Sequence, residues 1–154
     1  MPEPADLATV TAIHLAEVES GPVHAVDRVE AVAGAGLRGD RYFEPGADPE
    51  RHLTLIESEE LERLAAEDGI ALAPGESRRQ LTTRGVRLNP LVGRRFKVGV
   101  VECRGIELCE PCSHLQKLTG RAGLMRAAAH RAGLNAEILT DGEIAVGDVI
   151  EALD

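Results

Sequence analysis

Glycines and turn signals divide the second half of the chain into segments too short for long helices. Short stretches rich in valine, leucine and isoleucine end at Gly85, Gly93 and Gly99, and at the pair Asp141–Gly142. Glycine is costly inside helices and strands and occurs where the backbone turns sharply. Many short strands at close spacing are typical of a barrel or a curled sheet. We therefore predict a mainly β fold, a closed or curled β-barrel with a few short peripheral α-helices.

The clearest helix is predicted over residues 58–68. Ser58 is predicted to be the N-cap, with Glu59 and Glu60 in the first turn, where carboxylates interact favourably with the helix dipole. Asp68–Gly69 supplies the stop signal. Further helical turns are predicted over 113–118 and 124–130. Strands are predicted over 9–17, 23–32, 52–56, 81–83, 96–101, 105–108, 134–139 and 143–152, and Asp141–Gly142 is predicted to be a hairpin turn.

Length and composition favour one globular domain over residues 1–154, with residues 1–7 as a loose N-terminus. The chain is 44% hydrophobic and 28% charged, which argues against a disordered tail, a collagen or a coiled-coil rod. The N-terminal residues lack the basic and apolar regions of a signal peptide, and no stretch is long enough to span a membrane. Three cysteines within ten residues do not form a secreted disulfide framework. A cytoplasmic protein is expected.

The charge distribution argues against nucleic-acid and membrane partners. The net charge is −9, and the three aromatic residues are Tyr42, Phe43 and Phe96, too few for a base-stacking surface. Residues 78–104 nevertheless hold eight of the seventeen arginines and lysines and only one acid, Glu102. This basic segment could bind a small anionic ligand, because arginine pairs well with phosphate and carboxylate. The alternative is a solvated face that balances acidic neighbours.

Cys112 is the strongest candidate for a reactive residue. It stands directly before the predicted helix at 113–118, and unpaired backbone N–H groups at a helix start stabilise a thiolate. The alternative is a buried structural cysteine. Cys109 and Cys112 have the spacing of a thioredoxin-like pair, but no parallel crossover surrounds them. A zinc site of Cys103, Cys109, Cys112 and His114 would have suitable atoms without the usual paired spacing.

The sequence GLRGDR, residues 36–41, is predicted to form part of a ligand-pocket wall. Gly36 and Gly39 allow backbone conformations or a close approach that a Cβ atom would prevent. Asp40 and Arg41 add polar groups beside them. The alternative is a structural turn in which Asp40 bonds its own backbone and Arg41 forms a surface ion pair.

Five segments along the chain carry a family resemblance: GLRGDR at 36–41, HLTLIESEEL at 52–61, SRRQLTTRGVRLNPLVGRRFKVG at 77–99, ELCEPCSHL at 107–115 and RAGLNAEILTDGEIAVGDVI at 131–150. In this order they together resemble the MOSC domain. This domain is the C-terminal module of molybdenum-cofactor sulfurases and also occurs as stand-alone bacterial proteins. The resemblance implies a mostly β-barrel fold with a few peripheral helices. The chain departs from the family pattern at Gln80, where many relatives have asparagine, and at Ala132, where the family pattern has glycine.

The resemblance implies that Cys112 is the functional thiol and the ligand of a molybdenum ion. It implies that the cofactor is the molybdenum cofactor, a pterin that carries a dithiolene and a terminal phosphate. The thiolate is a soft metal ligand, and arginines would bind the phosphate. Cys103 is predicted to be a packed thiol within a strand. The predicted cofactor-binding residues are Arg78, Arg79, Arg131, Gly39 and Arg41.

Three functions follow from this resemblance. In the first, the protein binds the molybdenum cofactor, carries sulfur on Cys112 for delivery to a metal centre, or does both. In the second, it is a molybdenum-cofactor-dependent reductase of N-hydroxylated compounds. In the third, it is a non-catalytic module that delivers the cofactor. The implied partners are a pyridoxal-phosphate-dependent cysteine desulfurase, or a molybdoenzyme or electron-donor protein.

Overall fold

The strands form two sheets in the computed structural model, which describes residues 7–153. Residues 1–6 of the predicted loose N-terminus lie outside this range. The large sheet has the order β11-β7-β8-β9-β5-β6-β1-β2, and the small sheet has the order β10-β3-β4. The strands are β1 (Thr9–Ala16), β2 (Val23–Val26), β3 (Arg28–Val32), β4 (Gly36–Leu37), β5 (Leu53–Glu57), β6 (Leu81–Arg84), β7 (Arg95–Val98), β8 (Val101–Leu108), β9 (Leu134–Ile138), β10 (Gly142–Ala145) and β11 (Ile150–Ala152).

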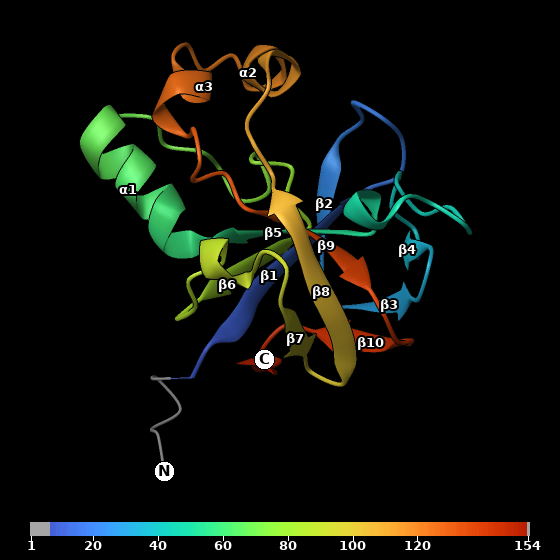
Figure 1. Ribbon diagram of the computed structural model, residues 1–154. Helices are drawn as coiled ribbons and strands as arrows, with labels where there is room; N and C mark the ends of the chain where they lie inside the picture. The colour runs from blue at the N-terminus through green and yellow to red at the C-terminus, as the bar shows by residue number, and fades with distance from the viewer. Residues whose placement is uncertain (1–6, 154) are drawn as a thin grey trace.

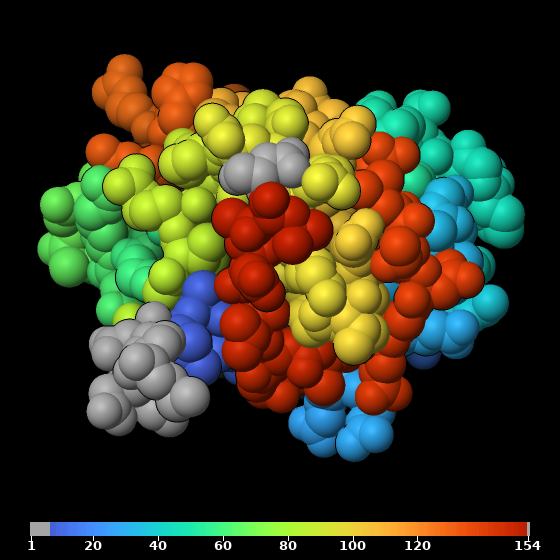
Figure 2. Space-filling model, turned by 60° about the horizontal axis from the view of Figure 1, so that its bottom comes forward, coloured from blue at the N-terminus to red at the C-terminus, as the bar shows by residue number. Residues whose placement is uncertain are grey.

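The large sheet curls so that its first strand meets the C-terminal segment. Thr9 forms an isolated antiparallel bridge with Val149, and the backbone N–H of Val10 donates to the carbonyl of Asp148 at 2.9 Å. Figure 2 shows the C-terminal strands, in red, lying against the yellow β7–β8 region. The predicted mainly β fold with a curled barrel-like sheet is confirmed.

The α-helices α1, α2 and α3 are gathered at one end of the curled sheet (Figure 1). A small second core of aliphatic side chains packs among them, including Leu64, Ile70, Leu115 and Leu124. None of the helices in residues 7–153 is long and apolar enough to cross a membrane. The α-helices are α1 (Ser58–Asp68), α2 (Ser113–Thr119) and α3 (Leu124–Ala127), and the short 3-10 helices are η2 (Pro49–Arg51) and η3 (Asn89–Leu91).

The main core lies inside the curled sheet and is built almost wholly from aliphatic residues. Strand β9 shows how the strands contribute to this core. Its alternate residues Leu134, Ala136 and Ile138 are buried, whereas the residues between them are half-buried. Phe96 on β7 is the aromatic residue in this core. Burial of each such side chain contributes roughly 1.5–3 kcal/mol. The core therefore fixes the positions of the loops at the ends of the strands.

Several predicted elements have different bounds in the structure. The predicted strand at 143–152 is two strands, because the chain turns at Gly147, whose φ is +96°. Residues 23–32 and 96–101 also contain turns between strands, and 105–108 is the end of the longer strand β8. The predicted helix at 124–130 ends at Ala127. The N-cap of α1 is Glu57 and not the predicted Ser58, which is the first residue of the helix.

The predicted hairpin at Asp141–Gly142 is wrong. β9 pairs with β5 and β8 in the large sheet, whereas β10 pairs with β3 in the small sheet. An Oδ1 atom of Asp141 accepts a hydrogen bond from the backbone N–H of Ala33 at 2.8 Å. The turn therefore passes the chain from one sheet to the other.

Candidate functional site

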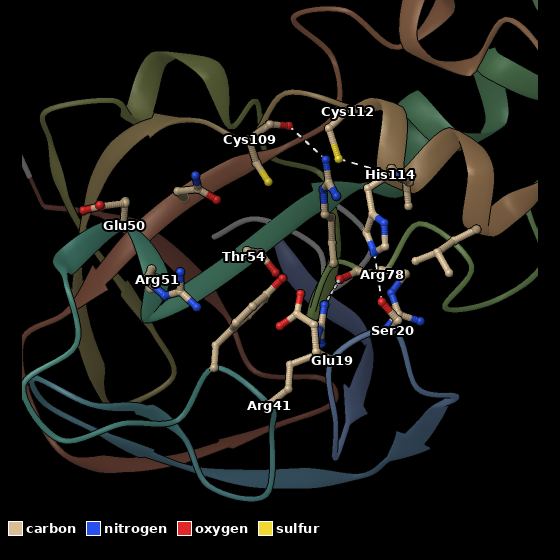
Figure 3. A pocket seen from close by; sticks show the side chains of 15 residues that line it. Glu19, Ser20, Arg41, Glu50, Arg51, Thr54, Arg78, Cys109, Cys112 and His114 are labelled. Carbon is tan, nitrogen blue, oxygen red and sulfur yellow. Dashed lines mark hydrogen bonds between the residues drawn. The ribbon is translucent and has the colours of Figure 1, made fainter.

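One pocket gathers side chains from segments that are far apart in the sequence (Figure 3). Its volume is about 270 Å³, near the lower end of the range for small-molecule sites. Cys109 and Cys112 lie at one end of the view and Arg41 at the other. The lining residues are Glu19, Ser20, Arg41, Tyr42, Glu50, Arg51, Thr54, Arg78, Arg79, Cys109, Cys112, His114, Leu115, Leu118 and Asn135.

Cys112 is an exposed thiol on the wall of this pocket. Its extended backbone ends the segment after β8, and α2 begins at the next residue, as the sequence predicts. The Sγ atom accepts a hydrogen bond from the backbone N–H of Leu115 at 3.4 Å. This contact orients the sulfur at the start of the helix and leaves it accessible to a ligand.

The other two cysteines have more enclosed surroundings. Cys109 also lines the pocket but is half-buried, and burial raises the pKa of its thiol, while the nearby Arg79 guanidinium opposes that rise. Cys103 is fully buried within β8, opposite Phe96, and burial raises the pKa of its thiol to about 12. Its packed position in a strand agrees with the sequence prediction.

We expect alkylation of the native protein to modify Cys112 first and Cys103 last. A thiol with a pKa near 12 is ionised in about one molecule in 100,000 at pH 7, and Cys103 is also inaccessible. Cys109 should react at an intermediate rate. Peptide mass spectrometry after timed treatment with iodoacetamide measures the order, and denaturant should expose all three thiols. Labelling of Cys103 as fast as Cys112 without denaturant would contradict this assignment.

Arg79 braces the segment that carries the two pocket cysteines. Its buried guanidinium donates to the carbonyls of Ala132 at 2.8 Å, Cys109 at 3.1 Å and Ser77 at 3.3 Å, with a longer contact to Glu110 at 3.4 Å. These bonds join three chain segments behind the pocket. Arg79 therefore has a structural task that its sequence pattern does not indicate, and its predicted binding of the cofactor stays a prediction.

Arg41 enters the pocket from the GLRGDR loop. Its Nη1 pairs with Oδ1 of Asp40 at 3.1 Å, and Nη2 donates to the carbonyl of Arg78 at 3.3 Å. The guanidinium carbon lies 4.3 Å from the centre of the Tyr42 ring. The Arg41 and Asp40 side chains are only 6% and 0% exposed, so the ion pair is buried and not a surface pair. Asp40 also bonds its own loop, because Oδ2 accepts from the backbone N–H of Tyr42.

Arg78 carries a buried donor for which residues 7–153 provide no hydrogen-bond partner. Its Nη1 donates to the carbonyl of Gly21 at 2.8 Å, whereas its Nη2 is buried and unpartnered. The residue also has a φ of +64°, a conformation that non-glycine residues adopt infrequently and that often occurs at functional sites. Burial and the nearby Arg41 lower the pKa of Arg78. An anionic group in the pocket would satisfy this donor.

Two predicted site residues lie outside the pocket wall. Gly39 is exposed in the GLRGDR loop, next to residues that do reach the pocket. Arg131 lines a separate surface cleft with Arg87, and its Nη1 lies 4.0 Å from a carboxylate oxygen of Glu67. The cofactor-binding role predicted for Gly39 and Arg131 stays a prediction, but the structure does not bring either residue to Cys112.

Most of the basic segment also lies elsewhere. Arg78 and Arg79 are the members of its eight cations that line the pocket. Lys97 on β7 projects outward and is paired in register with Glu102 of β8 and Glu151 of β11. Cross-strand pairs of opposite charge stabilise a sheet modestly. The concentration of arginine is thus explained only in part by the pocket.

Sequence reasoning missed several residues of the pocket rim. A hydrogen bond of 2.9 Å joins Oγ of Ser20 to Nε2 of His114, linking the turn after β1 to α2. Arg51 ends η2, and its guanidinium carbon is 5.2 Å from the centre of the Tyr42 ring. Neither contact has a local sequence signal, because each joins residues that are not near neighbours in the chain. The one available sequence signal was that Tyr42 directly follows GLRGDR, which was predicted to form part of the pocket wall.

The alternative zinc site is not formed. In the part of the chain that the structure describes, no three His, Cys, Asp or Glu side chains are grouped so that they could hold a metal ion. A single exposed thiol beside cations instead fits a ligand that brings its own metal and its own negative charge.

The fold is similar to that of several solved bacterial proteins. YuaD from Bacillus subtilis is 17% identical and superposes with a TM-score of 0.82 over 94% of each chain. YiiM from Geobacillus stearothermophilus is 14% identical, with a TM-score of 0.75 over 96% of this chain and 75% of that one. YiiM from Escherichia coli is 16% identical, with a TM-score of 0.69 over 95% and 70%. At these identities the likeness shows the fold alone.

A comparison with curated proteins gives no match. The family model of the MOSC domain, in contrast, matches residues 11–151. That match covers the curled sheet, the helices at its end and the pocket with Cys112. The chain therefore belongs to the MOSC domain family.

Proposed function

We propose that the protein binds the molybdenum cofactor in this pocket, with the Cys112 thiolate on the metal and Arg41 and Arg78 on the phosphate. The observation that carries the proposal is that one pocket holds both an exposed thiol and a buried arginine donor without a partner. A thiolate is a ligand for a soft metal, and a guanidinium pairs with phosphate oxygens. The two ends of the pocket thus match the two ends of this cofactor.

Other residues of the lining also fit the cofactor. Leu115 and Leu118 provide an apolar wall against which a pterin ring could pack, and Thr54 and Asn135 provide polar groups. Arg79 fixes the backbone that leads to Cys112 and so holds the thiol in place. When bound, the cofactor would supply a metal centre for redox or sulfur-transfer chemistry. The Cys112 thiolate would bind that metal, and Arg41 and Arg78 would neutralise the phosphate. The leucines would exclude water from the face of the pterin that packs on them.

A second candidate function, sulfur carriage, is favoured by the presence of Cys109 in the same pocket. The Cys112 thiolate would attack the terminal sulfur of a persulfide on a pyridoxal-phosphate-dependent cysteine desulfurase. The sulfur–sulfur bond of the donor breaks, its cysteine leaves as a thiolate, and Cys112 gains the persulfide with no net oxidation. Attack of the Cys109 thiolate on the Sγ of Cys112 would then release hydrosulfide and form a disulfide.

Reduction of N-hydroxylated compounds and simple cofactor delivery are two alternative uses of the same binding site. Reduction would need an electron-donor protein, and delivery would need a molybdoenzyme as the recipient. Cofactor-loaded protein that reduces an N-hydroxylated compound with an artificial electron donor would support the reductase. Loaded protein that instead transfers its cofactor to an empty molybdoenzyme without turnover would support delivery.

The proposal predicts stoichiometric molybdenum and pterin in protein purified from a host that makes the cofactor. Elemental analysis measures the metal, and fluorescence of the oxidised, released pterin measures the organic part. Intact-mass spectrometry under anaerobic conditions detects an additional sulfur atom. Persulfide without molybdenum would transfer support from cofactor binding to sulfur carriage. Absence of molybdenum, pterin and persulfide from folded protein would refute both candidate functions.

A further inference from the structure

The carboxylate of Asp40 is buried and contacts Arg41, which lines the pocket at the end away from the two cysteines. Its Oδ1 accepts from the backbone N–H of Ala16 at 3.1 Å and from Nη1 of Arg41 at 3.1 Å. Its Oδ2 accepts from Nε2 of Gln80 at 2.7 Å and from the backbone N–H of Tyr42 at 3.2 Å. Four donors from three chain segments therefore converge on one side chain that is 0% exposed.

Gln80 continues this network to the central strands. Its Oε1 accepts from the backbone N–H of Thr54 at 2.9 Å, and its own backbone N–H donates to Oγ1 of Thr54 at 2.9 Å. Thr54 lies on β5 and lines the pocket. Gln80 thus directs its amide at Asp40 and Thr54, which ties the GLRGDR loop to the barrel. Buried networks in which each member is bonded are rigid.

Arg41 connects this rigid network to Arg78. One nitrogen of the Arg41 guanidinium is held by Asp40, and the other donates to the carbonyl of Arg78 at 3.3 Å. Arg78 is the residue with the positive φ and the unpartnered buried Nη2. Two guanidinium groups that are close together repel each other, and the Asp40 carboxylate is the anion in direct contact with one of them. Asp40 therefore both orients Arg41 and offsets its charge.

We propose that Asp40 is a positioning residue for anion binding, which holds Arg41 and, through it, Arg78 in the geometry that receives a phosphate monoester. The inference deepens the proposed function, because the phosphate of the molybdenum cofactor belongs to this ligand class. Asp40 itself faces its four donors and does not touch the ligand. Its effect on the ligand passes through the Arg41 guanidinium.

The sign of one mutational effect separates this role from a simple charge effect. Asp40→Asn removes a negative charge near an anion site, so electrostatics alone would strengthen phosphate binding. If Asp40 positions Arg41, the variant should instead bind phenyl phosphate about tenfold or more weakly, because the asparagine amide cannot accept from all four donors. Asp48→Asn is the matched control, since it makes the same change at an exposed carboxylate that lies outside the pocket lining, and it should not weaken binding.

The test uses phenyl phosphate and the cofactor-free protein, with affinity measured by calorimetry and folding by circular dichroism. In an Arg41→Ala background, Asp40→Asn should cause little further loss, because its effect acts through Arg41. Should Asp40→Asn fail to fold, Arg41→Lys keeps the charge but cannot bridge Asp40 and the Arg78 carbonyl, and should also bind about tenfold more weakly. Unchanged or tighter binding by folded Asp40→Asn would overturn the inference, as would wild-type affinity in Arg41→Lys or no binding by wild type.

This outcome is independent of molybdenum. Protein that binds phenyl phosphate and loses it on Asp40→Asn, yet never acquires molybdenum or pterin, would support the positioning role and refute cofactor binding. Protein that acquires the cofactor while Asp40→Asn keeps full phosphate affinity would refute the positioning role and support cofactor binding. The two proposals therefore fail on different measurements.

Discussion

Cys112→Ser is expected to abolish both molybdenum loading and persulfide formation, whereas Cys103→Ser should leave both largely intact. A serine hydroxyl is a harder ligand than a thiolate, is not ionised at neutral pH, and cannot carry sulfur. At position 112 the substitution removes the exposed sulfur of the pocket. At position 103 the same substitution falls inside the core, away from the pocket. Molybdenum per folded chain and anaerobic intact mass measure the two effects.

Cys109→Ser separates the two pocket thiols. If Cys112 alone binds the metal, this variant should retain molybdenum, and it should lose the disulfide that sulfur release would leave. Cys103→Ser is also expected to lower the free energy of unfolding by about 1–2 kcal/mol, because it places a hydroxyl in the core. Molybdenum loading must therefore be normalised to the amount of folded protein. Full loading of Cys112→Ser, or complete loss of loading in Cys103→Ser with the fold intact, would remove Cys112 from the site.

Elements whose signals are local could be predicted well from the sequence. α1 occupies the predicted range 58–68, with Glu59 and Glu60 in its first turn and Gly69 in the left-handed conformation at its end. β9 alternates buried and half-buried residues as its apolar pattern predicts. Each of these signals is encoded within the element itself, by caps and by side-chain periodicity. The resemblance to the family added the expectation of a mostly β-barrel fold with a few peripheral helices.

Strand partners could not be read in the same way. Asp141–Gly142 has the composition of a hairpin turn, yet the strand after it pairs with β3, more than a hundred positions earlier in the chain. The bond from Ala33 to Asp141 is part of that distant pairing. Local turn chemistry fixes a change of direction, whereas the identity of the partner strand depends on which hydrophobic faces meet.

The same limit applies to the site. Cys112 could be selected because a thiol before a helix start is a local pattern. Arg79 could not be separated from Arg78, since adjacent arginines look alike in sequence, and only the fold turns one towards backbone carbonyls and leaves the other with an unpartnered donor. Arg131 precedes Ala132, whose carbonyl braces Arg79, but its own side chain points to a different cleft. Side-chain direction was the missing information.

Gly133→Ala is expected to destabilise the protein by about 3–5 kcal/mol. Gly133 has a φ of +116°, and a Cβ atom there would lie 2.0 Å from the carbonyl oxygen of Leu55, in the backbone of β5. The oxygen belongs to a strand whose side chains are all buried, so it cannot move aside cheaply. The new methyl group therefore adds a backbone collision to the conformational strain.

Gly120→Ala is the matched control for this substitution. Gly120 also has a positive φ, +66°, at the end of α2, but no atom lies within 4 Å of an added Cβ. It should therefore cost only about 1 kcal/mol, the price of the left-handed conformation. Urea unfolding measures the free energy of unfolding of each variant, and the two values can be compared if both variants have the same dependence on urea concentration.

The larger effect should also reach the pocket. The carbonyl of Gly133 accepts from the backbone N–H of Cys109 at 2.8 Å, and the neighbouring carbonyl of Ala132 accepts from Arg79. A shift of this backbone away from Leu55 would therefore displace the segment that carries the two pocket cysteines. Folded Gly133→Ala should show an altered alkylation rate at Cys112, while Gly120→Ala should not, because its methyl group meets no neighbouring atom. Equal stability and equal Cys112 reactivity in the two variants would contradict the close approach of residue 133 to β5, and with it the account of how the barrel fixes the thiol.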